Sequence, residues 1–359
     1  MINQYEPTLS ADLNKKMDKY LTSGGWLTEF KETQAFEERI KSEANTEHAI
    51  AVTNGTTAIE LMLQAVKDGI RDEVLIPNFT MAATAMACHS VGLKPVCVPV
   101  SFPSLTMCPE TMADFVTEKT LAVIFMPANG RSGTLFDIRQ QIETINKRRS
   151  KPIRFLMDGA QALGSQTPCD QKILSLAEIS TTSFSMPKII TTGQGGMVLT
   201  DSEDSAMKIK KLKDFGRSRG GMDIHDEYGT NCKFTDVQAV IGSSQMENIE
   251  WRKNRKREIY RKYRDAFSDR LLPMSHNEVP WFYELLTPNS EELINQLKHV
   301  GISSRKMYPS LHKQKFMNQN ISCDTTKKID LEGVWLPSHL NLTDVMIEEV
   351  IENVKNAVS

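Results

Sequence analysis

A single lysine, Lys188, lies just before a glycine-rich bend with the sequence TTGQGG. Apolar and β-branched residues on both sides, from Ile179 to Thr200, are typical of two strands that form a hairpin. Glycines in the bend would let the backbone come close to a bound molecule. A lone lysine in a loop is more often a solvated surface residue, so a second signal is needed before chemistry is assigned to it.

The second signal is an aspartate at the end of an apolar strand. Phe155, Leu156 and Met157 precede Asp158, and a carboxylate in this place often lies at the mouth of a site in an α/β sheet. The alternative is an ordinary aspartate that caps the next turn. A lysine combined with such a carboxylate is typical of pyridoxal phosphate chemistry. There the lysine forms a Schiff base, and the aspartate keeps the pyridinium nitrogen protonated.

A third element has the residues of an anion site. Asn54, Gly55, Thr56 and Thr57 open an amphipathic segment that is expected to be helical over residues 58–67. Free backbone N–H groups and the positive end of the helix dipole favour a phosphate at a helix start. Simple N-capping by Asn54 or Thr56 explains the same residues equally well.

Strands and helices alternate from about residue 48 to residue 200. Expected strands cover 48–53, 73–77, 95–100, 120–126 and 153–157, and expected helices cover 30–42, 58–67, 81–91 and 137–149. This alternation predicts an α/β fold with a mostly parallel sheet and helices on both faces. Further helices are expected over 206–215, 234–246 and 249–267.

The pattern changes after about Leu271. A strand is expected over 281–286, a helix over 291–299, a strand over 301–307 and a helix over 343–358. Together these elements predict a compact C-terminal α+β unit. We therefore expect a large domain over residues 1–250 and a small C-terminal domain over residues 251–359.

Composition argues against several classes of protein. A formal net charge of -2 gives no electrostatic case for binding nucleic acid or an anionic membrane. No apolar run is long enough to span a bilayer, and the N-terminal residues have no apolar core of the signal-peptide type. The six cysteines lack any paired spacing, so we expect reduced thiols in a cytoplasmic protein, with no disulfide framework and no metal site.

Several motifs, in order along the chain, resemble the DegT/DnrJ/EryC1/StrS family of sugar aminotransferases, which use pyridoxal 5'-phosphate (PLP) on a type I fold. The resemblance covers nearly the whole chain. It rests on TNGTTAIEL from Thr53, DEVLIPNFTMAATA from Asp72, MDGAQALGS from Met157, SFSMPKIITTGQGG from Ser183 and NCKFTDVQAVIG from Asn231. It implies a large PLP-binding domain, in which helices sandwich the sheet, and a small α+β domain.

The resemblance also implies roles for the residues around the cofactor ring. Lys188 would form the Schiff base and move the proton between substrate and cofactor. Asp158 would pair with the pyridine nitrogen, and Gln161 would hydrogen-bond the phenolic oxygen. Lys188 would thus be the catalytic residue, supported by two residues that bind the ring.

Further roles concern the phosphate of the cofactor. By resemblance, Ser183 would bind the phosphate together with the backbone of Gly55, Thr56 and Thr57. Asn231 matches an asparagine that, in the family, reaches the phosphate of the cofactor in the neighbouring subunit. The resemblance therefore implies a homodimer with shared active sites.

The chain departs from the family pattern at three positions. Met81 stands where the family usually has an aromatic ring stacked on the cofactor, although a thioether can also pack on a ring. Gln194 replaces a common glutamate, and Pro187 is unusual before the lysine. Family members that have histidine in place of the lysine are dehydratases, so Lys188 favours transamination.

The resemblance implies transfer of an amino group from an amino acid, with glutamate as the expected donor, to a keto-sugar that is most often nucleotide-linked. The product would serve the synthesis of lipopolysaccharide, other cell-surface polysaccharides or other glycoconjugates. Some members act on unlinked sugar acids or small phosphorylated ketones. The loop 216–226 and the segment 129–134 are expected to shape the acceptor pocket. A PLP-dependent lyase or dehydratase and a PLP-binding regulator without activity are the alternatives.

Overall fold

The computed structural model describes residues 1–218, 222–317 and 319–358, and its central feature is a seven-stranded sheet. The strand order is β1-β7-β6-β5-β4-β2-β3, and β7 runs antiparallel to both of its neighbours while the other pairs are parallel. The predicted mostly parallel sheet is therefore confirmed. Its strands are β1 His48–Val52, β2 Glu73–Pro77, β3 Lys94–Val98, β4 Thr120–Phe125, β5 Arg154–Asp158, β6 Ile179–Ser183 and β7 Gly196–Thr200.

The predicted hairpin is formed by β6 and β7. These strands pair antiparallel from Ile179 opposite Thr200 to Ser183 opposite Gly196, and Lys188 lies in the connection between them. A Cβ atom at Gly196 would lie only 2.4 Å from the carbonyl oxygen of Asn54. Glycine is therefore required where β7 begins, because the strand lies directly against Asn54 at the start of α3 (Gly55–Val66).

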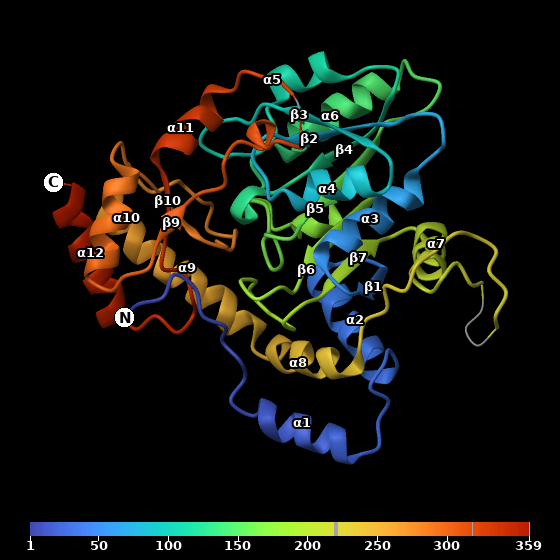
Figure 1. The fold of residues 1–359 in the computed structure, drawn as a ribbon, viewed down its shortest axis with the longest axis horizontal. Coiled ribbons are helices and arrows are strands. Elements are labelled where there is room, and N and C mark those ends of the chain that lie inside the picture. Colours follow the sequence, from blue (N-terminus) through green and yellow to red (C-terminus); the bar gives the residue numbers. More distant parts are fainter. Residues whose placement is uncertain (219–221, 318, 359) are drawn as a thin grey trace.

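Helices cover both faces of the sheet (Figure 1). One core contains side chains of α2 (Lys31–Ala44), α6 (Leu135–Asn146) and α8 (Asp236–Met246). The other contains side chains of α3 (Gly55–Val66), α4 (Ala83–Ser90) and α7 (Glu203–Lys213). Successive strand residues belong to opposite cores, as with Ala51 and Val52 of β1, because side chains alternate across a strand.

A second sheet lies beside the first, toward the C-terminal end of the chain (Figure 1). It has the antiparallel order β8-β10-β9. The bounds are β8 Tyr283–Leu286, β9 Arg305–Lys306 and β10 Gly333–Leu336, with α9 Ile249–Phe267, α10 Ser290–His299, α11 Asp324–Glu332 and α12 Asp344–Val358. This part has its own apolar core, which also holds Ile2 from the start of the chain. The domain boundary at residues 250/251 stays a prediction, and it falls inside α9.

Some elements differ from the prediction. The strand expected over 301–307 is only Arg305–Lys306, because Gly301 has a φ of +80° and Ile302 bridges to Ile2 instead. The helices α1 (Leu13–Thr22), α5 (Pro109–Met112) and α11, and the strand β10, were not predicted. The short 3-10 turns cover Ala113–Phe115, Ala128–Gly130, Ile173–Ser175 and Leu311–Lys313. Within the described residues, no helix has the length and apolar character needed to cross a membrane.

Candidate active site

Asp158 ends β5 with its carboxylate buried, since only 4% of the residue is exposed. Its Oδ2 accepts a hydrogen bond of 2.7 Å from the hydroxyl of Thr84 on α4. Its Oδ1 accepts a bond of 3.2 Å from the backbone N–H of Ala160. A buried carboxylate needs positive or donating partners, and the bond from Ala160 is long, so this carboxylate is suited to pair with a cation.

The amine of Lys188 lies over an aromatic ring. Its Nζ is 4.0 Å from the centroid of the Trp281 ring, which is a cation–π distance. Burial lowers the pKa of Lys188 to about 8, and the negative charge of Asp158 opposes part of this effect. A lowered pKa leaves part of the amine neutral near neutral pH, as a nucleophile and a proton carrier require.

Three consecutive backbone carbonyl groups fix the loop that carries the lysine. The indole N–H of Trp281 donates to the carbonyl of Pro187 at 2.6 Å, and the hydroxyl of Tyr5 donates to the carbonyl of Lys188 at 2.9 Å. The guanidinium of Arg252 donates to the carbonyl of Ile189 at 3.1 Å. The lysine is therefore positioned by residues from the start of the chain, from α9 and from the segment before β8.

The predicted phosphate residues come together at the start of α3. A Cβ atom at Gly55 would lie 2.8 Å from the Cβ of Ser183, so the helix start and the end of β6 are in contact. The side chain of Asn54 caps the helix by accepting from the N–H of Thr57 at 2.9 Å. The N–H groups of Gly55 and Thr56 have no acceptor among the described residues, so they are free to bind an anion.

Gln161 is oriented by the backbone beyond β4. Its Oε1 accepts a hydrogen bond of 2.6 Å from the N–H of Asn129, and its Nε2 has no partner among the described residues. Gln161, Ser183 and Lys188 line one small cavity of about 20 Å³. The bond to Oε1 fixes the orientation of the Gln161 amide and leaves its Nε2 group available as a donor. The expected hydrogen bond to a cofactor oxygen requires such a donor.

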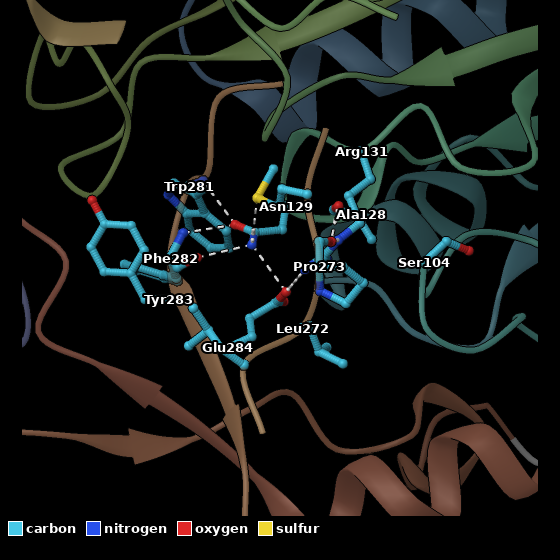
Figure 2. A network of polar contacts seen from close by, with 12 residues as sticks. Ser104, Ala128, Asn129, Arg131, Leu272, Pro273, Trp281, Phe282, Tyr283 and Glu284 are labelled. Carbon is cyan, nitrogen blue, oxygen red and sulfur yellow. Dashed lines mark hydrogen bonds and ion pairs between the residues drawn. The ribbon is translucent and has the colours of Figure 1, made fainter. Parts of the chain in front are cut away.

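Asn129 and Arg131 join the two parts of the fold (Figure 2). Oδ1 of Asn129 accepts from the N–H groups of Trp281 and Phe282, each at 2.7 Å, and its Nδ2 donates to Glu284 at 3.0 Å. The guanidinium of Arg131 forms a buried ion pair of 2.5 Å with Glu284. The expectation that segment 129–134 shapes an acceptor pocket is therefore wrong for these two side chains, because this junction uses them.

Two predicted residues are exposed. Met81 is 48% exposed, and its sulfur accepts from the N–H of Ala83 at 3.0 Å, where α4 begins. Asn231 is exposed on a segment that bridges to Asp214, and its side chain forms no hydrogen bond with the described residues. The expected acceptor loop 216–226 includes residues 219–221, which lie outside the described residues.

Sequence reasoning missed the residues that support Lys188 and Asp158. Thr84 lies within the motif DEVLIPNFTMAATA, but no role is assigned to it there, and Tyr5, Arg252 and Trp281 are distant in the sequence. A buried aromatic segment at 281–283 was visible as WFY, but periodicity indicates a strand there and says nothing about contact with an amine.

The fold and the site together define an α/β enzyme with one reactive amine, one buried carboxylate and one anion cradle at adjoining strand and helix ends. The sequence pattern of the DegT/DnrJ/EryC1/StrS aminotransferase family matches residues 7–355, so the chain belongs to this family. The cofactor is therefore PLP, and the enzyme is an aminotransferase.

Relatives and solved structures agree with this assignment. The chain is 27% identical to a GDP-perosamine synthase of Vibrio cholerae, over 99% of both chains. It is 29% identical to one of Caulobacter vibrioides, over 88% of this chain and 87% of the other. Its fold resembles that of PseC of Helicobacter pylori, an aminotransferase involved in the biosynthesis of pseudoaminic acid. The TM-score is 0.92 at 20% identity, and 99% of both chains is covered.

The residues present fit PLP on structural grounds. The start of α3 contacts Ser183 and has free N–H groups that can bind a phosphate. The buried carboxylate of Asp158 can pair with a protonated ring nitrogen. When bound, PLP supplies an electron sink that stabilises negative charge on the substrate carbon. We propose that Gly55, Thr56, Thr57 and Ser183 hold the phosphate. In the same proposal Asp158 holds the ring nitrogen charged, and Lys188 binds the cofactor and moves the proton.

Proposed function

We propose that this aminotransferase moves an amino group from glutamate to a keto-sugar carried on a nucleotide. The proposal rests on three features that occur together in one site. They are the Lys188 amine, the buried Asp158 carboxylate, and the free N–H groups at the start of α3, where Gly55 contacts Ser183. The acceptor class is supported by two relatives that share nearly the whole chain and are named for a GDP-linked amino sugar. The product would enter the synthesis of a cell-surface polysaccharide or another glycoconjugate.

Anionic substrates need a cation that no protein group already occupies. Lys256 and Arg252 are buried near the site, and both donate to backbone carbonyl groups. Arg305 on β9 is exposed, and none of the described carboxylates lies within ion-pair distance of it. Its guanidinium carbon lies 4.7 Å from the centroid of Trp335, a ring that packs edge-on against Trp281. We therefore propose that Arg305 binds an anionic group of a substrate.

The working form is proposed to be a homodimer in which Asn231 of one chain serves the site of the other. Support comes from the exposure of Asn231 together with exposed apolar residues near the start of α2. Trp26 is 64% exposed, Leu27 is 60% exposed, and the rings of Trp26 and Phe30 stack at 5.4 Å. Such apolar exposure is unusual on the surface of a monomer and is typical of an interface. A cytoplasmic location agrees with the six cysteines, all of which are free thiols.

The test uses purified enzyme, PLP, glutamate and a panel of keto-sugars carried on GDP, UDP or dTDP, together with unlinked sugar acids and small phosphorylated ketones. Release of 2-oxoglutarate that depends on one nucleotide-linked acceptor is the expected result. Release only with an unlinked acceptor would contradict the proposed substrate class. A lyase or dehydratase would consume substrate without releasing 2-oxoglutarate, and a regulator would bind PLP without turnover.

Trapping provides the matched control. Borohydride reduction should attach the cofactor to the peptide that contains Lys188 in the native protein. Lys188→Ala should bind PLP reversibly and gain no mass on that peptide. Attachment to another lysine would contradict the role proposed for Lys188, whatever the acceptor proves to be.

A further inference from the structure

The reactive amine lies over the face of the Trp281 ring. The Nζ of Lys188 lies 4.0 Å from the ring centroid, and Trp281 is only 6% exposed. The negative face of an indole ring attracts a cation, more strongly when water is excluded. The ring therefore favours the charged form of the amine, whereas burial favours the neutral form.

Three hydrogen bonds fix this ring in place. The indole Nε1–H donates to the carbonyl of Pro187 at 2.6 Å, and the backbone N–H donates to Oδ1 of Asn129 at 2.7 Å. The backbone carbonyl accepts from the buried amine of Lys256 at 2.7 Å. The ring also packs against Trp335, with centroids 5.7 Å apart and an interplanar angle of 68°. A ring with one orientation can serve as a fixed partner for a moving side chain.

The bond to Pro187 gives the arrangement its specificity. It connects the ring directly to the residue before the lysine, so the ring position and the lysine backbone are coupled. A phenylalanine would offer an aromatic face but could not donate this bond. Tryptophan is therefore the aromatic residue that can hold both the loop and the amine.

We propose that Trp281 is a positioning residue that holds the Lys188 ammonium against its ring whenever the amine is not bonded to cofactor. Held in this way, the amine keeps a defined position beside the ring, and the ring stabilises its protonated form. The inference rests on the proposed role of Lys188, and it gives the amine an electrostatic partner in addition to the Asp158 carboxylate. No residue of the family motifs supplies this contact.

The test measures the protonation of Lys188 in cofactor-free protein, so that it does not depend on activity. A reagent that modifies only neutral amines is applied across a pH series, and mass spectrometry quantifies the peptide with Lys188. The titratable groups around this amine and its ring are Asp158 on β5 and Lys256 on α9, together with Tyr5, which bonds the Lys188 carbonyl, and Tyr308, which packs against Trp281. They stay unchanged because the only alteration is replacement of tryptophan by its mono-, di- and trifluorinated forms. Fluorine weakens the negative ring face with little change in size.

The expected midpoint of modification lies near pH 8 with ordinary tryptophan. Fluorination should lower it stepwise, by on the order of half a pH unit in total, because the ring then stabilises the ammonium less. The chain has four tryptophans, so Trp281→Phe grown with the same analogues is the matched control. Its midpoint should not respond to fluorination.

Each other outcome counts against the proposal. A midpoint in the native sequence that does not respond to fluorination would show that the ring acts only as an apolar wall. An equal response in Trp281→Phe would assign the effect to the other tryptophans. Neither result would contradict the proposed amino-group transfer, because the release of 2-oxoglutarate tests that reaction separately.

Discussion

The hydroxyl of Thr84, in the first turn of α4, donates a hydrogen bond of 2.7 Å to the carboxylate of Asp158 at the end of β5. The same hydroxyl lies 3.0 Å from the hydroxyl of Thr80. Because Thr84 has one proton and gives it to the carboxylate, Thr80 must be the donor between the two hydroxyls. The start of α4 thus sets the orientation of the carboxylate through two successive hydroxyl groups.

The first prediction concerns this bond. Thr84→Val keeps the shape of the side chain but leaves a buried carboxylate oxygen without its donor, which costs about 1.5–3 kcal/mol for a charged acceptor. We expect PLP affinity and kcat/KM to fall about tenfold to a hundredfold, and Thr84→Ser to restore most of both. Equilibrium dialysis and steady-state kinetics measure these effects. Equal losses in the valine and serine variants would mean that packing, and not the bond, matters.

The second prediction concerns the charge of Asp158. Asp158→Asn keeps the size of the side chain but loses the negative charge that is proposed to hold the ring nitrogen protonated. Removal of a preorganised electrostatic partner costs about 3–4 kcal/mol, so kcat should fall about a hundredfold to a thousandfold. Single-turnover kinetics with glutamate test this expectation. Turnover close to the native rate would mean that the carboxylate only caps the turn at Ala160.

The third prediction concerns the proposed homodimer. Asn231→Ala should weaken PLP retention, and loss of PLP should lower the thermal stability of the dimer, because cofactor that bridges two chains stabilises their association. Inactive Lys188→Ala is then mixed with a nearly inactive Asn231→Ala under conditions of subunit exchange. Heterodimers should regain activity in the one site that has both native residues. No recovery after verified exchange would refute the shared site.

The fourth prediction concerns pH and Lys256. Burial lowers the pKa of Lys256 to about 7, from an ordinary value of 10.5. Between these values the unfolded chain binds more protons, so the free energy of unfolding rises with pH by up to about 1.4 kcal/mol per pH unit. Below pH 7 both states are protonated, and the cost of burying the charge is fully present.

Lys256→Met should therefore flatten the rise in stability of the cofactor-free protein between about pH 7 and pH 10. Chemical denaturation at a series of pH values measures this slope. The control is Lys298→Met, which removes an exposed lysine of α10 and should leave the slope unchanged. The same slope in all three proteins would show that the buried amine does not titrate in this range.

The fifth prediction concerns Arg305. Arg305→Gln should raise the KM of one anionic substrate about tenfold or more, because a charged hydrogen bond contributes about 1.5–3 kcal/mol. A rise in the KM of glutamate alone would assign the arginine to the donor carboxylate. A rise in the KM of the keto-sugar nucleotide alone would assign it to the acceptor phosphates. Unchanged values for both would remove Arg305 from the site.

The sequence was informative where local pattern and chemistry coincide. Lys188 and Asp158 could be found because the ends of β5 and β6 are marked by runs of apolar and β-branched residues, and strand ends of parallel sheets lie on one edge. The pairing of Ser183 with Gly55 was implied only by the family resemblance, and the structure does place Gly55 against Ser183.

The remaining features depend on contacts between distant residues. The strand β10 is only four residues long and begins at Gly333, the C-cap residue of α11, and no local pattern indicates its place between β8 and β9. The segment 129–134 reads as a polar loop, yet Asn129 is 3% exposed because Trp281 and Phe282 bind it. Only tertiary structure distinguishes such a junction from a substrate loop.

The fixing of the lysine loop has a consequence for the order of folding. Its three carbonyl groups bind residues that are 183, 63 and 94 positions away, in Tyr5, Arg252 and Trp281. Contacts of such separation form slowly, because the entropy of closing long loops opposes them. A nascent chain cannot make all three contacts until Trp281 has left the ribosome. The loop that carries the reactive amine is therefore completed only after more than three quarters of the chain has been synthesised.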